Sequence, residues 1–599
     1  MSLENKRIEL AIFGAFVISC IFLIPNVLIK RELDNGGLSY HPITLMVEED
    51  EARLYAPMIK ISSFSIWPGD YLLSNSDKPL LWPPLPTAIL GFANRFVDIE
   101  TLRILINAFV PSIIFIILYT IFTYLGGNTI ITLGSSLVLT VTGYIATLLP
   151  FSNLSQLNQF IALFNPFVQR PVLHHLFMDR IFSPEITFVP LALFILLFIL
   201  GLVKEGRFWG VSAGLTFGLL FYTYFYDWVT ITIILAVFIL ITLFYREWKL
   251  VRFGLKVFVI GLLGSFYYWI TFFRLSVLPQ FMELKLRVGD LEVGHFLRYQ
   301  GLELHYLLWL ILSYLIYKRS EKKRDPKLLF AMAIFLGAII VHNVQIVTGY
   351  VPEAGHFLRF TLAIPLFIAY FICLKFTWDN YVISLIKLKP IIYATFIIGV
   401  VLVITHTVSA QIGFARDSAQ RYTIPAHMEA PIVWAKKEFG PTDTYITNST
   451  VSNIYLSLLT PGRGYYPPSG LSSLVSDSEL IERLVFTHKY FGKSDDDVME
   501  LFSEPYLVNP KDIEQKSVKI LLNKVSFRNE DIKKVQKLAN EALANRRLLG
   551  DIALNKYKFN YVYIGPNEYS VSTSSSDVLL KVCLVPVYSD KETKIYRRC

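Results

Sequence analysis

Long apolar runs separated by short polar stretches dominate the first two thirds of the chain. Most of these runs are close to the roughly 20 residues that a helix needs to cross a bilayer. Their ranges are 8–29, 103–125, 129–149, 184–203, 208–225, 228–245, 253–273, 303–317, 328–347, 359–377 and 390–410. The pattern predicts a polytopic α-helical membrane protein with about 11 transmembrane helices.

Clusters of lysine and arginine separate alternate pairs of these runs. They are Lys204 with Arg207, then Arg246, Lys249 and Arg252, then the basic stretch 318–327, and finally Lys387 with Lys389. Cytoplasmic loops of membrane proteins carry an excess of positive residues, and all of these clusters fall inside if the N-terminus is cytoplasmic. We therefore expect a long first outer loop at 30–102 and an outer C-terminal region.

The pattern changes character after residue 410. Residues 476–503 and 528–547 have the apolar spacing of amphipathic helices, whereas Thr444–Thr447 and Tyr561–Ile564 are short β-branched or aromatic runs typical of strands. Nearly 190 residues are enough for a separate core. The sequence thus predicts a transmembrane domain at 1–410 and an extracytoplasmic mixed α/β domain at 411–599.

Composition supports a membrane location and narrows the partners. Of 599 residues, 54% are hydrophobic and only 17% are charged, compared with about a quarter charged in soluble domains. The formal charge of +9 is typical of basic inner loops, so we expect the lipid bilayer of the plasma membrane as a partner and no nucleic acid. The richness in Ile, Lys and Tyr suggests a prokaryote, and among prokaryotes an archaeon.

Three features of the predicted outer parts bear on their compartment. Asn153 and Asn448 each begin an Asn-Xaa-Ser/Thr sequon, and both fall on the predicted outer side. Cys583 and Cys599 lie near the C-terminus and could form a disulfide if the compartment is oxidising. The sequence leaves this pairing open.

Four consecutive carboxylates occupy the first outer loop, at residues 48–51. Like charges packed this closely repel one another unless cations or substrate neutralise them. Asp50 is our candidate general base, with Glu49 or Glu51 positioning the acceptor hydroxyl and Tyr55 orienting substrate. The alternative is that the acids cap a helix lying on the bilayer. Four in a row favour the functional interpretation.

Four cations near the same predicted face are candidates for binding a phosphate. Arg180 has a planar fork that can contact two phosphate oxygens, and His356 and Arg359 lie one helical turn apart. Lys78 stands in a proline-rich segment and could pair with the acidic loop or a phosphate. Ordinary anchoring at the membrane interface remains the alternative for Lys78, His356 and Arg359.

Further ionisable residues near that face could orient substrate or hold a metal ion. His174, His175 and Asp179 could bind a divalent cation such as Mg or Mn, although their spacing matches no strong ligand pattern. Glu185 follows a proline at a helix start, where a carboxylate is also favourable for purely structural reasons. Asp227 stands among interfacial aromatics, where an aspartate needs a partner.

Three segments of the chain resemble a known family. Asp50-Glu51-Ala52-Arg53-Leu54-Tyr55 resembles the Asp-Glu loop of GT-C superfamily glycosyltransferases. Lys78-Pro79-Leu80-Leu81-Trp82 is similar to a Lys-Pro-Pro-Leu stretch of the protein-mannosyltransferase and aminoarabinose-transferase branch. The segment Pro431–Trp434, leading to Asp443–Ile446, resembles the start of the outer domain in prokaryotic members. The second outer loop lacks a clear Asp-Glu pair, and the outer domain lacks the Trp-Trp-Asp signature of oligosaccharyltransferases.

The resemblance implies an enzyme that transfers a sugar from a polyprenyl-phosphate donor to a lipid, glycan or protein acceptor at the outer membrane face, with inversion. A transporter or flippase of lipid-linked saccharide is one alternative, and a non-catalytic assembly protein is another. Transporters usually place ionisable groups near the bilayer midplane. The centres of the apolar runs are almost free of charge, which favours the enzyme.

Overall fold

The computed structural model describes most of the chain and divides it into two units. The described residues are 3–41, 73, 84–142, 154–165, 185–288, 290–297, 304–319, 325–352, 354–357, 361–382, 389–470, 473–524, 527–549, 556–571 and 583–599. The first unit, here called the helical unit, comprises Met1–Glu32, Arg103–Thr271 and Leu291–Ala419. The second, here called the mixed unit, comprises Leu33–Leu102, Phe272–Asp290 and Gln420–Cys599.

This division differs from the boundary expected at 410. Helix α19 (Lys389–Ser418) continues past that position without a break, so the helical unit ends at Ala419. The mixed unit also takes in two segments from the membrane-domain part of the sequence, 33–102 and 272–290. Hydropathy places segments in or out of the bilayer, but it does not say which soluble core a loop joins.

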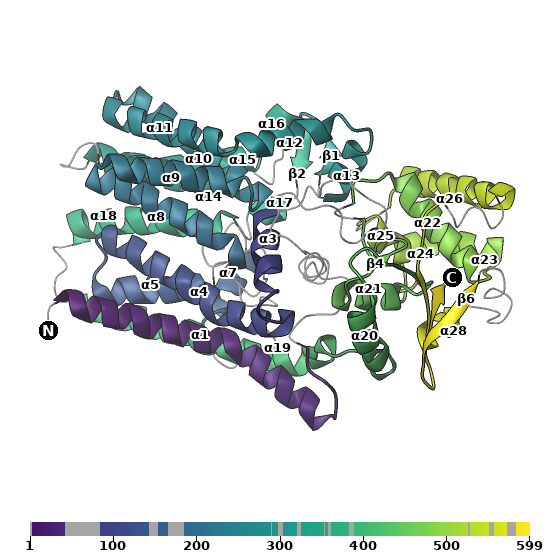
Figure 1. Ribbon diagram of the computed structural model, residues 1–599. Coiled ribbons are helices and arrows are strands. Elements are labelled where there is room, and N and C mark those ends of the chain that lie inside the picture. The colour runs from purple at the N-terminus through teal and green to yellow at the C-terminus, as the bar shows by residue number, and fades with distance from the viewer. Residues whose placement is uncertain are drawn as a thin grey trace. The chain divides into compact units, whose positions relative to one another are not determined.

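Helices account for nearly all of the described part of the helical unit (Figure 1), and the described part of each predicted apolar run coincides with one or two of them. Their bounds are α1 (Leu3–Asn35), α4 (Ile99–Tyr124), α5 (Thr129–Val141), α7 (Leu154–Ala162), α8 (Phe188–Lys204), α9 (Arg207–Leu220), α10 (Phe225–Phe244), α11 (Trp248–Gly264), α12 (Phe266–Ser276), α14 (Leu304–Arg319), α15 (Pro326–Val341), α16 (Gln345–Thr348), α17 (Ala354–His356), α18 (Ala363–Thr377) and α19. Strands β1 (Asp290–Val293) and β2 (Tyr350–Pro352) form a two-stranded sheet.

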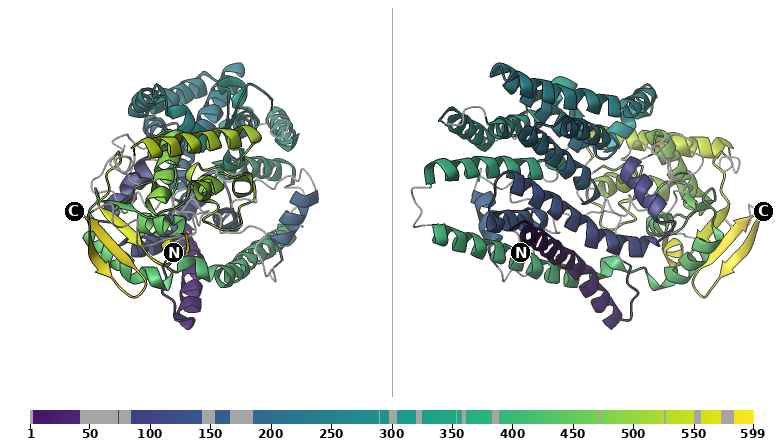
Figure 2. Two further views of the ribbon diagram at one scale, coloured as in Figure 1. Left: turned by 90° about the vertical axis from the view of Figure 1, so that its right-hand side faces the viewer. Right: turned by 60° about the vertical axis from the view of Figure 1, so that its left-hand side comes forward.

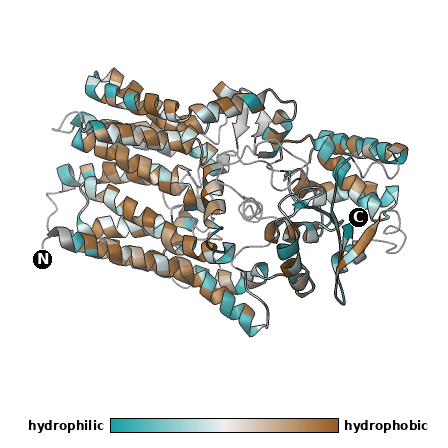
Figure 3. Cartoon of the chain, viewed as in Figure 1, coloured by the Kyte–Doolittle hydropathy of each residue, from teal (hydrophilic) through white to brown (hydrophobic). Residues whose placement is uncertain are grey.

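Several of these helices are long and apolar enough to cross a bilayer. Within the described residues four qualify, Lys6–Asn35, Glu100–Tyr124, Phe225–Phe244 and Lys389–Tyr422, and a fifth if α11 and α12 form one span. Those two helices meet at a bend of 55°. Figure 3 shows the apolar residues running along these helices. The chain is therefore a multi-pass membrane protein, whereas the total of about 11 spans stays a prediction.

Local sequence signals explain where individual helices begin. Asp325 accepts a hydrogen bond from the Lys327 amide at 2.8 Å, and Pro326 occupies the first turn of α15. Asn128 caps α5 in the same way through the Ile131 amide at 2.9 Å. Asp, Asn and a first-turn proline are favoured there because the first amides of a helix lack intrahelical partners.

Close backbone approach defines the contact between α9 and α11. Figures 1 and 2 show these helices side by side with α8 and α10. Glycines recur every four residues along α9, at 210, 214 and 218. A Cβ built on Gly218 would lie 3.0 Å from the Gly261 carbonyl oxygen and 3.0 Å from the Gly264 Cα atom. Small residues thus allow van der Waals contact between backbones, which holds helices together in a lipid environment.

The mixed unit contains a five-stranded sheet in the order β4-β3-β5-β7-β6. The strands are β3 (Thr444–Ile446), β4 (Arg463–Gly464), β5 (Tyr561–Ile564), β6 (Leu584–Ser589) and β7 (Lys594–Arg598). Strand β3 pairs in parallel with β4 and β5, whereas β7 pairs antiparallel with β5 and β6. Both predicted strands are therefore confirmed.

The helices of the mixed unit precede the strands or lie between them in the sequence, and they supply much of the hydrophobic core. They are α3 (Pro84–Ala93), α13 (Phe281–Val288), α20 (Ala426–Glu438), α21 (Thr450–Leu459), α22 (Asp477–Tyr490), α23 (Asp495–Glu500), α24 (Glu504–Val508), α25 (Ser517–Leu521), α26 (Asn529–Leu549) and α28 (Pro566–Val571). Helices α22 and α26 pack together and correspond to the two predicted amphipathic helices, although the first ends at Tyr490 and α23 follows after a turn.

A buried arginine ties segment 272–290 into the mixed unit. Arg287 of α13 is 2 % exposed, and its guanidinium donates to the Ser473 carbonyl at 3.2 Å and to the Val475 carbonyl. The Asn523 side chain donates to the Arg287 carbonyl, and Asp477 lies 3.8 Å from Nε. A buried cation is tolerated only with such partners, so these bonds specify one position for α13.

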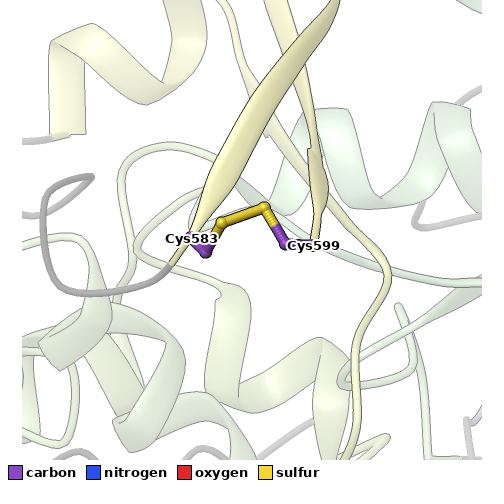
Figure 4. The surroundings of a disulfide bond; sticks show 2 residues. All are labelled: Cys583 and Cys599. Atoms are coloured by element: carbon purple, nitrogen blue, oxygen red, sulfur yellow. A yellow bond between two sulfur atoms is a disulfide. The ribbon is translucent and has the colours of Figure 1, made fainter.

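A disulfide between Cys583 and Cys599 closes the β6–β7 hairpin (Figure 4), which resolves the pairing that the sequence left open. The next pair along the ladder is Leu584 opposite Arg598. Structural disulfides persist in oxidising compartments. The two remaining cysteines, Cys20 and Cys373, are free.

Replacing glycine by alanine should have opposite effects at two positions, because only one of them lies in the α9–α11 contact. Gly218→Ala should lower the thermal unfolding midpoint of the detergent-solubilised protein, because the new methyl group meets backbone atoms that move only if the helices separate. Gly399→Ala in α19 meets only a ring carbon of Phe164, at 3.5 Å, and should keep or raise the midpoint because alanine favours helix. Equal midpoints for the two variants would contradict this account of the packing.

Candidate functional site

Three of the predicted site residues lie in described parts of the chain, namely Glu185, Asp227 and His356. The others lie outside the described residues, and their roles stay predictions. These are Glu49, Asp50, Glu51, Tyr55, Lys78, His174, His175, Asp179, Arg180 and Arg359. The candidate site therefore consists of these three residues and the side chains that they contact.

Asp227 is a buried carboxylate in the first turn of an apolar helix. It is the one charged residue in the sequence of α10 and is 0 % exposed. The Thr361 hydroxyl donates to its Oδ1 atom at 2.8 Å. Its Oδ2 atom has no hydrogen-bond partner in the described part of the chain. A half-satisfied buried carboxylate is costly, and such groups in membrane helices mark functional positions.

His356 contacts two tyrosines at the start of α10, Tyr224 and Tyr226. The Tyr224 hydroxyl forms a hydrogen bond with its Nδ1 atom. The Tyr226 ring stacks on the imidazole, with the ring centroids 4.8 Å apart and the planes 21° from parallel. The hydrogen bond fixes which ring nitrogen faces Tyr224, and the stacking fixes the ring plane. The histidine is thus held in one orientation.

These contacts join two sequence segments into one cluster, here called the Asp227–His356 cluster. Tyr226 and Asp227 are neighbours in sequence, while His356 and Thr361 come from the segment that leads into α18. Phe357 packs edge-on against Tyr226 at 4.8 Å. The sequence singled out both segments, but it gave no sign that they meet. Thr361 carries no motif of its own and was missed.

The Asp227–His356 cluster lies at helix ends. Helix α10 begins at Phe225 and α18 at Ala363, so the Thr361–Asp227 bond brings two N-terminal ends together. His342 directly follows α15, and its ring centroid lies 6.2 Å from that of Phe357. Ionisable groups therefore collect at one end of α10, α15 and α18, while the inner turns of these helices are apolar.

Glu185 belongs to a buried ion pair that the sequence did not reveal. Its Oε2 atom accepts a hydrogen bond from Arg103 Nη1 at 2.9 Å, and the two side chains are 0% and 4% exposed. Asn107, one turn further along α4, also contacts the guanidinium. An arginine at the start of a predicted span resembles an interface anchor, so nothing in the sequence pairs it with Glu185.

Metal ligands do not gather among the described residues. No group of three or more His, Cys, Asp or Glu side chains is placed to hold an ion in the described ranges. The predicted ligands His174, His175 and Asp179 lie outside those ranges. The described cluster offers instead a carboxylate oxygen, an oriented imidazole and aromatic faces.

Comparisons with known proteins give a structural likeness and no sequence match. No family model matches the chain, and no curated protein matches it. Among solved structures, the chain is similar to ArnT from Cupriavidus metallidurans bound to undecaprenyl phosphate, with a TM-score of 0.42, 10% identity and coverage of 96% of this chain and 97% of that one. The apo state of the same protein gives a TM-score of 0.39, 11% identity and the same coverage. At TM-scores below 0.5 this similarity does not decide the family.

The buried ion pair predicts a strongly non-additive pair of substitutions. Arg103→Met should destabilise the protein by roughly 3–5 kcal/mol, because it removes the buried guanidinium that donates to the buried Glu185 carboxylate. The double variant Arg103→Met, Glu185→Leu should recover most of that loss, because neither charge remains buried. Thermal unfolding in detergent measures both. Additive losses would show that the pair does not act as a unit.

Proposed function

We propose that the chain is a membrane glycosyltransferase of the GT-C superfamily. It transfers a sugar from a polyprenyl-phosphate donor to an acceptor at the outer membrane face. Among the described residues, the observation that carries this proposal is the half-satisfied Asp227 carboxylate beside an oriented His356 at the ends of apolar helices. A donor with a polar head and a lipid tail would present its phosphate and sugar at that depth.

The cluster suits recognition of a sugar phosphate. Asp227 Oδ2 can accept a hydrogen bond from a sugar hydroxyl, which would satisfy its buried oxygen. His356, when protonated, would bind the donor phosphate, and its contacts with Tyr224 and Tyr226 hold it in place beforehand. Groups oriented in advance stabilise developing charge without reorganising during the reaction.

The proposed chemistry assigns a role to each of the remaining predicted residues. Asp50, positioned by Glu49 or Glu51, takes the proton of the acceptor hydroxyl. The acceptor oxygen forms the new bond to the anomeric carbon as the bond from that carbon to the phosphate oxygen breaks. Polyprenyl phosphate leaves as an anion, and the anomeric configuration inverts.

Cations stabilise the departing phosphate, and other side chains orient the sugar. Arg180, Arg359 and Lys78 supply positive charge along with His356. Glu185, Asp179 and Tyr55 orient sugar hydroxyls together with Asp227. His174, His175 and Asp179 would hold a divalent cation, Mg or Mn, if the reaction uses one, and a chelator tests that part separately.

Charge and disulfide chemistry support an outer location for the acceptor. The Cys583–Cys599 disulfide indicates an oxidising compartment for the mixed unit. The basic clusters between apolar runs indicate cytoplasmic loops. We therefore propose a plasma-membrane protein with a cytoplasmic N-terminus, an extracytoplasmic mixed unit, and a lipid, glycan or protein acceptor outside.

A transporter or flippase of the same lipid-linked saccharide is the second candidate. Carriers concentrate ionisable groups near the midplane on broken helices. The described helices place Asp227 and His356 at their ends, which favours chemistry at the surface. The bend between α11 and α12 is the feature that a carrier would share.

A transfer assay tests the proposal. Purified wild-type protein, incubated with labelled polyprenyl-phosphate sugars and membrane extract, should move label to a new product. Asp50→Asn should reduce the rate by about 10²–10⁴-fold, the usual contribution of a general base. Asp227→Asn should also reduce the rate, because an amide replaces the buried carboxylate that accepts the sugar hydroxyl.

A matched control separates these effects from a general loss of charge. Asp379 is an exposed acid that pairs with Lys375. It lies just past the C-terminal end of α18, whereas the Asp227–His356 cluster lies at the N-terminal end of that helix. Asp379→Asn should therefore transfer sugar like the wild type. Full activity in Asp50→Asn, or no transfer from any donor by folded wild-type protein, would contradict the proposal.

A further inference from the structure

Six cations gather where two short links join helices of the helical unit. The first link, Glu205-Gly206, connects α8 to α9, and the second, residues 245–247, connects α10 to α11. The cations of these links and of the helix turns beside them are here called the basic cluster: Lys204, Arg207, Arg246, Lys249, Arg252 and Lys256. Only two acids, Glu205 and Glu247, lie in the same stretches, 204–207 and 245–256. The cluster therefore carries an excess of positive charge.

Packing around one phenylalanine brings the two links together. Phe253 of α11 lies so close to α8 that a Cβ built on Gly201 would overlap its ring, and a Cβ built on Gly210 of α9 would lie 3.2 Å from the same ring. Lys249 and Lys256 stand four residues before and three residues after Phe253, so they share its helix face. Both lysines therefore lie on the side of α11 that meets the end of α8 and the start of α9.

Further contacts fix two lysines of the cluster without neutralising them. The Lys256 ammonium group donates to the Arg207 carbonyl oxygen at 2.9 Å. The Lys204 ammonium group lies 4.8 Å from the centroid of the Tyr124 ring and 5.4 Å from that of the Trp209 ring. A carbonyl group or an aromatic face orients a cation but brings no negative charge to cancel its own. These ammonium groups thus keep their charge at defined positions.

Both links hold an uncommon backbone conformation. Glu205 and Arg246 have φ values of 49° and 58°, in the left-handed region that residues other than glycine rarely adopt. Hydrogen bonds close the second link, from the Arg246 amide to the Leu243 carbonyl at 2.9 Å and from the Glu247 amide to the Thr242 carbonyl at 2.8 Å. Such conformations persist only where the surrounding structure holds them. The cations are therefore kept near one another by the fold itself.

The charge of the basic cluster is not neutralised by the described part of the chain. None of its six cations forms an ion pair with an acid there. Five of them are exposed, and Lys256 is half-buried. By contrast, Lys327 and Lys375, which belong to the same predicted side of the membrane, pair with Asp325 and Asp379. Like charges repel one another, so an anion that bridges the cluster would relieve that repulsion.

Exposed apolar side chains continue from the cluster along two helices. On α9, Val211 and Leu215 follow Arg207 at four-residue intervals and are 37% and 59% exposed. On α11, Leu255 follows Arg252 by three residues and is 45% exposed. Residues three or four apart lie on the same face of a helix. Each arginine therefore stands at the head of an exposed apolar stripe.

Aromatic residues beside the cations indicate the depth of the cluster in a bilayer. Phe208 and Trp248 are neighbours of Arg207 and Lys249 in sequence, and their side chains are 68% and 58% exposed. Exposed aromatic rings and basic residues at the ends of apolar helices are typical of the boundary between lipid headgroups and acyl chains. A soluble anion would gain nothing from the apolar stripes, whereas a lipid carries both a charged head and apolar chains.

We infer that the basic cluster binds the phosphate headgroup of an anionic membrane lipid, with the acyl chains of that lipid against the apolar stripes of α9 and α11. Arg207 and Arg252 can each donate two hydrogen bonds to phosphate oxygens, and the lysines add point charges. The predicted topology puts this lipid in the inner leaflet, where anionic lipids attract basic segments. The site belongs to the helical unit alone and does not depend on the proposed transferase activity.

Native mass spectrometry of the full-length protein in neutral detergent tests this site. Phosphatidylglycerol, which is anionic, should bind more tightly than phosphatidylcholine, which has no net charge. The double variant Arg207→Gln, Lys249→Gln should bind phosphatidylglycerol roughly tenfold more weakly or worse, because each basic side chain near a lipid phosphate adds to the attraction. Its binding of phosphatidylcholine should stay the same. The single variant Arg252→Gln should also weaken binding of phosphatidylglycerol.

A matched control removes the same charge elsewhere on the same predicted side of the membrane. Lys6 and Arg7 are exposed cations at the start of α1, and Lys6→Gln, Arg7→Gln should bind phosphatidylglycerol like the wild type. Inorganic phosphate, the soluble probe, should not displace the lipid. Equal affinity of the wild type for the two lipids, equal losses in the two double variants, or displacement of phosphatidylglycerol by inorganic phosphate would overturn the inference.

Discussion

Burial of the Asp227 carboxylate at the end of an apolar helix is the constraint on which the candidate site depends. A charge removed from water is stable only with a partner. The Thr361 hydroxyl supplies one hydrogen bond, which fixes the approach of the segment leading into α18 to the start of α10. The same approach brings His356 into contact with Tyr224 and Tyr226. The geometry of the cluster thus follows from one incompletely satisfied group.

The same requirement shapes the rest of the molecule. In the helical unit Arg103 neutralises Glu185, which joins α4 to the start of α8. In the mixed unit Arg287 reaches two backbone carbonyls, and Glu568 links the carboxyl ends of β3 and β5. Buried polar groups that are fully bonded hold one arrangement. Asp227 keeps one oxygen without a hydrogen-bond partner in the described part of the chain, and we place the donor sugar beside it.

Much of the fold could be predicted from the sequence, because hydropathy and β-branched runs report local structure directly. The described part of each predicted apolar run is mostly helical, and strands form at Thr444–Ile446 and Tyr561–Ile564 as expected. Contacts between distant segments could not be predicted. Thr361 and Arg103 carry no local signal for the partners they find, and hydropathy does not show that α11 ends at Gly264 and resumes as α12. Of the candidate site, the sequence identified Asp227, Glu185 and His356 but not the bonds that hold them.

The central claim is that the protein transfers a lipid-linked sugar to an acceptor, using charged groups at the helix ends. It does not move the intact lipid-linked sugar across the membrane. Reconstituted vesicles containing a doubly labelled polyprenyl-phosphate sugar, supplied with acceptor from membrane extract, test this most directly. The account predicts that the sugar separates from its phosphate, yielding free polyprenyl phosphate and a glycosylated product. Recovery of the donor intact in the opposite leaflet, with no bond broken, would contradict it and identify a flippase.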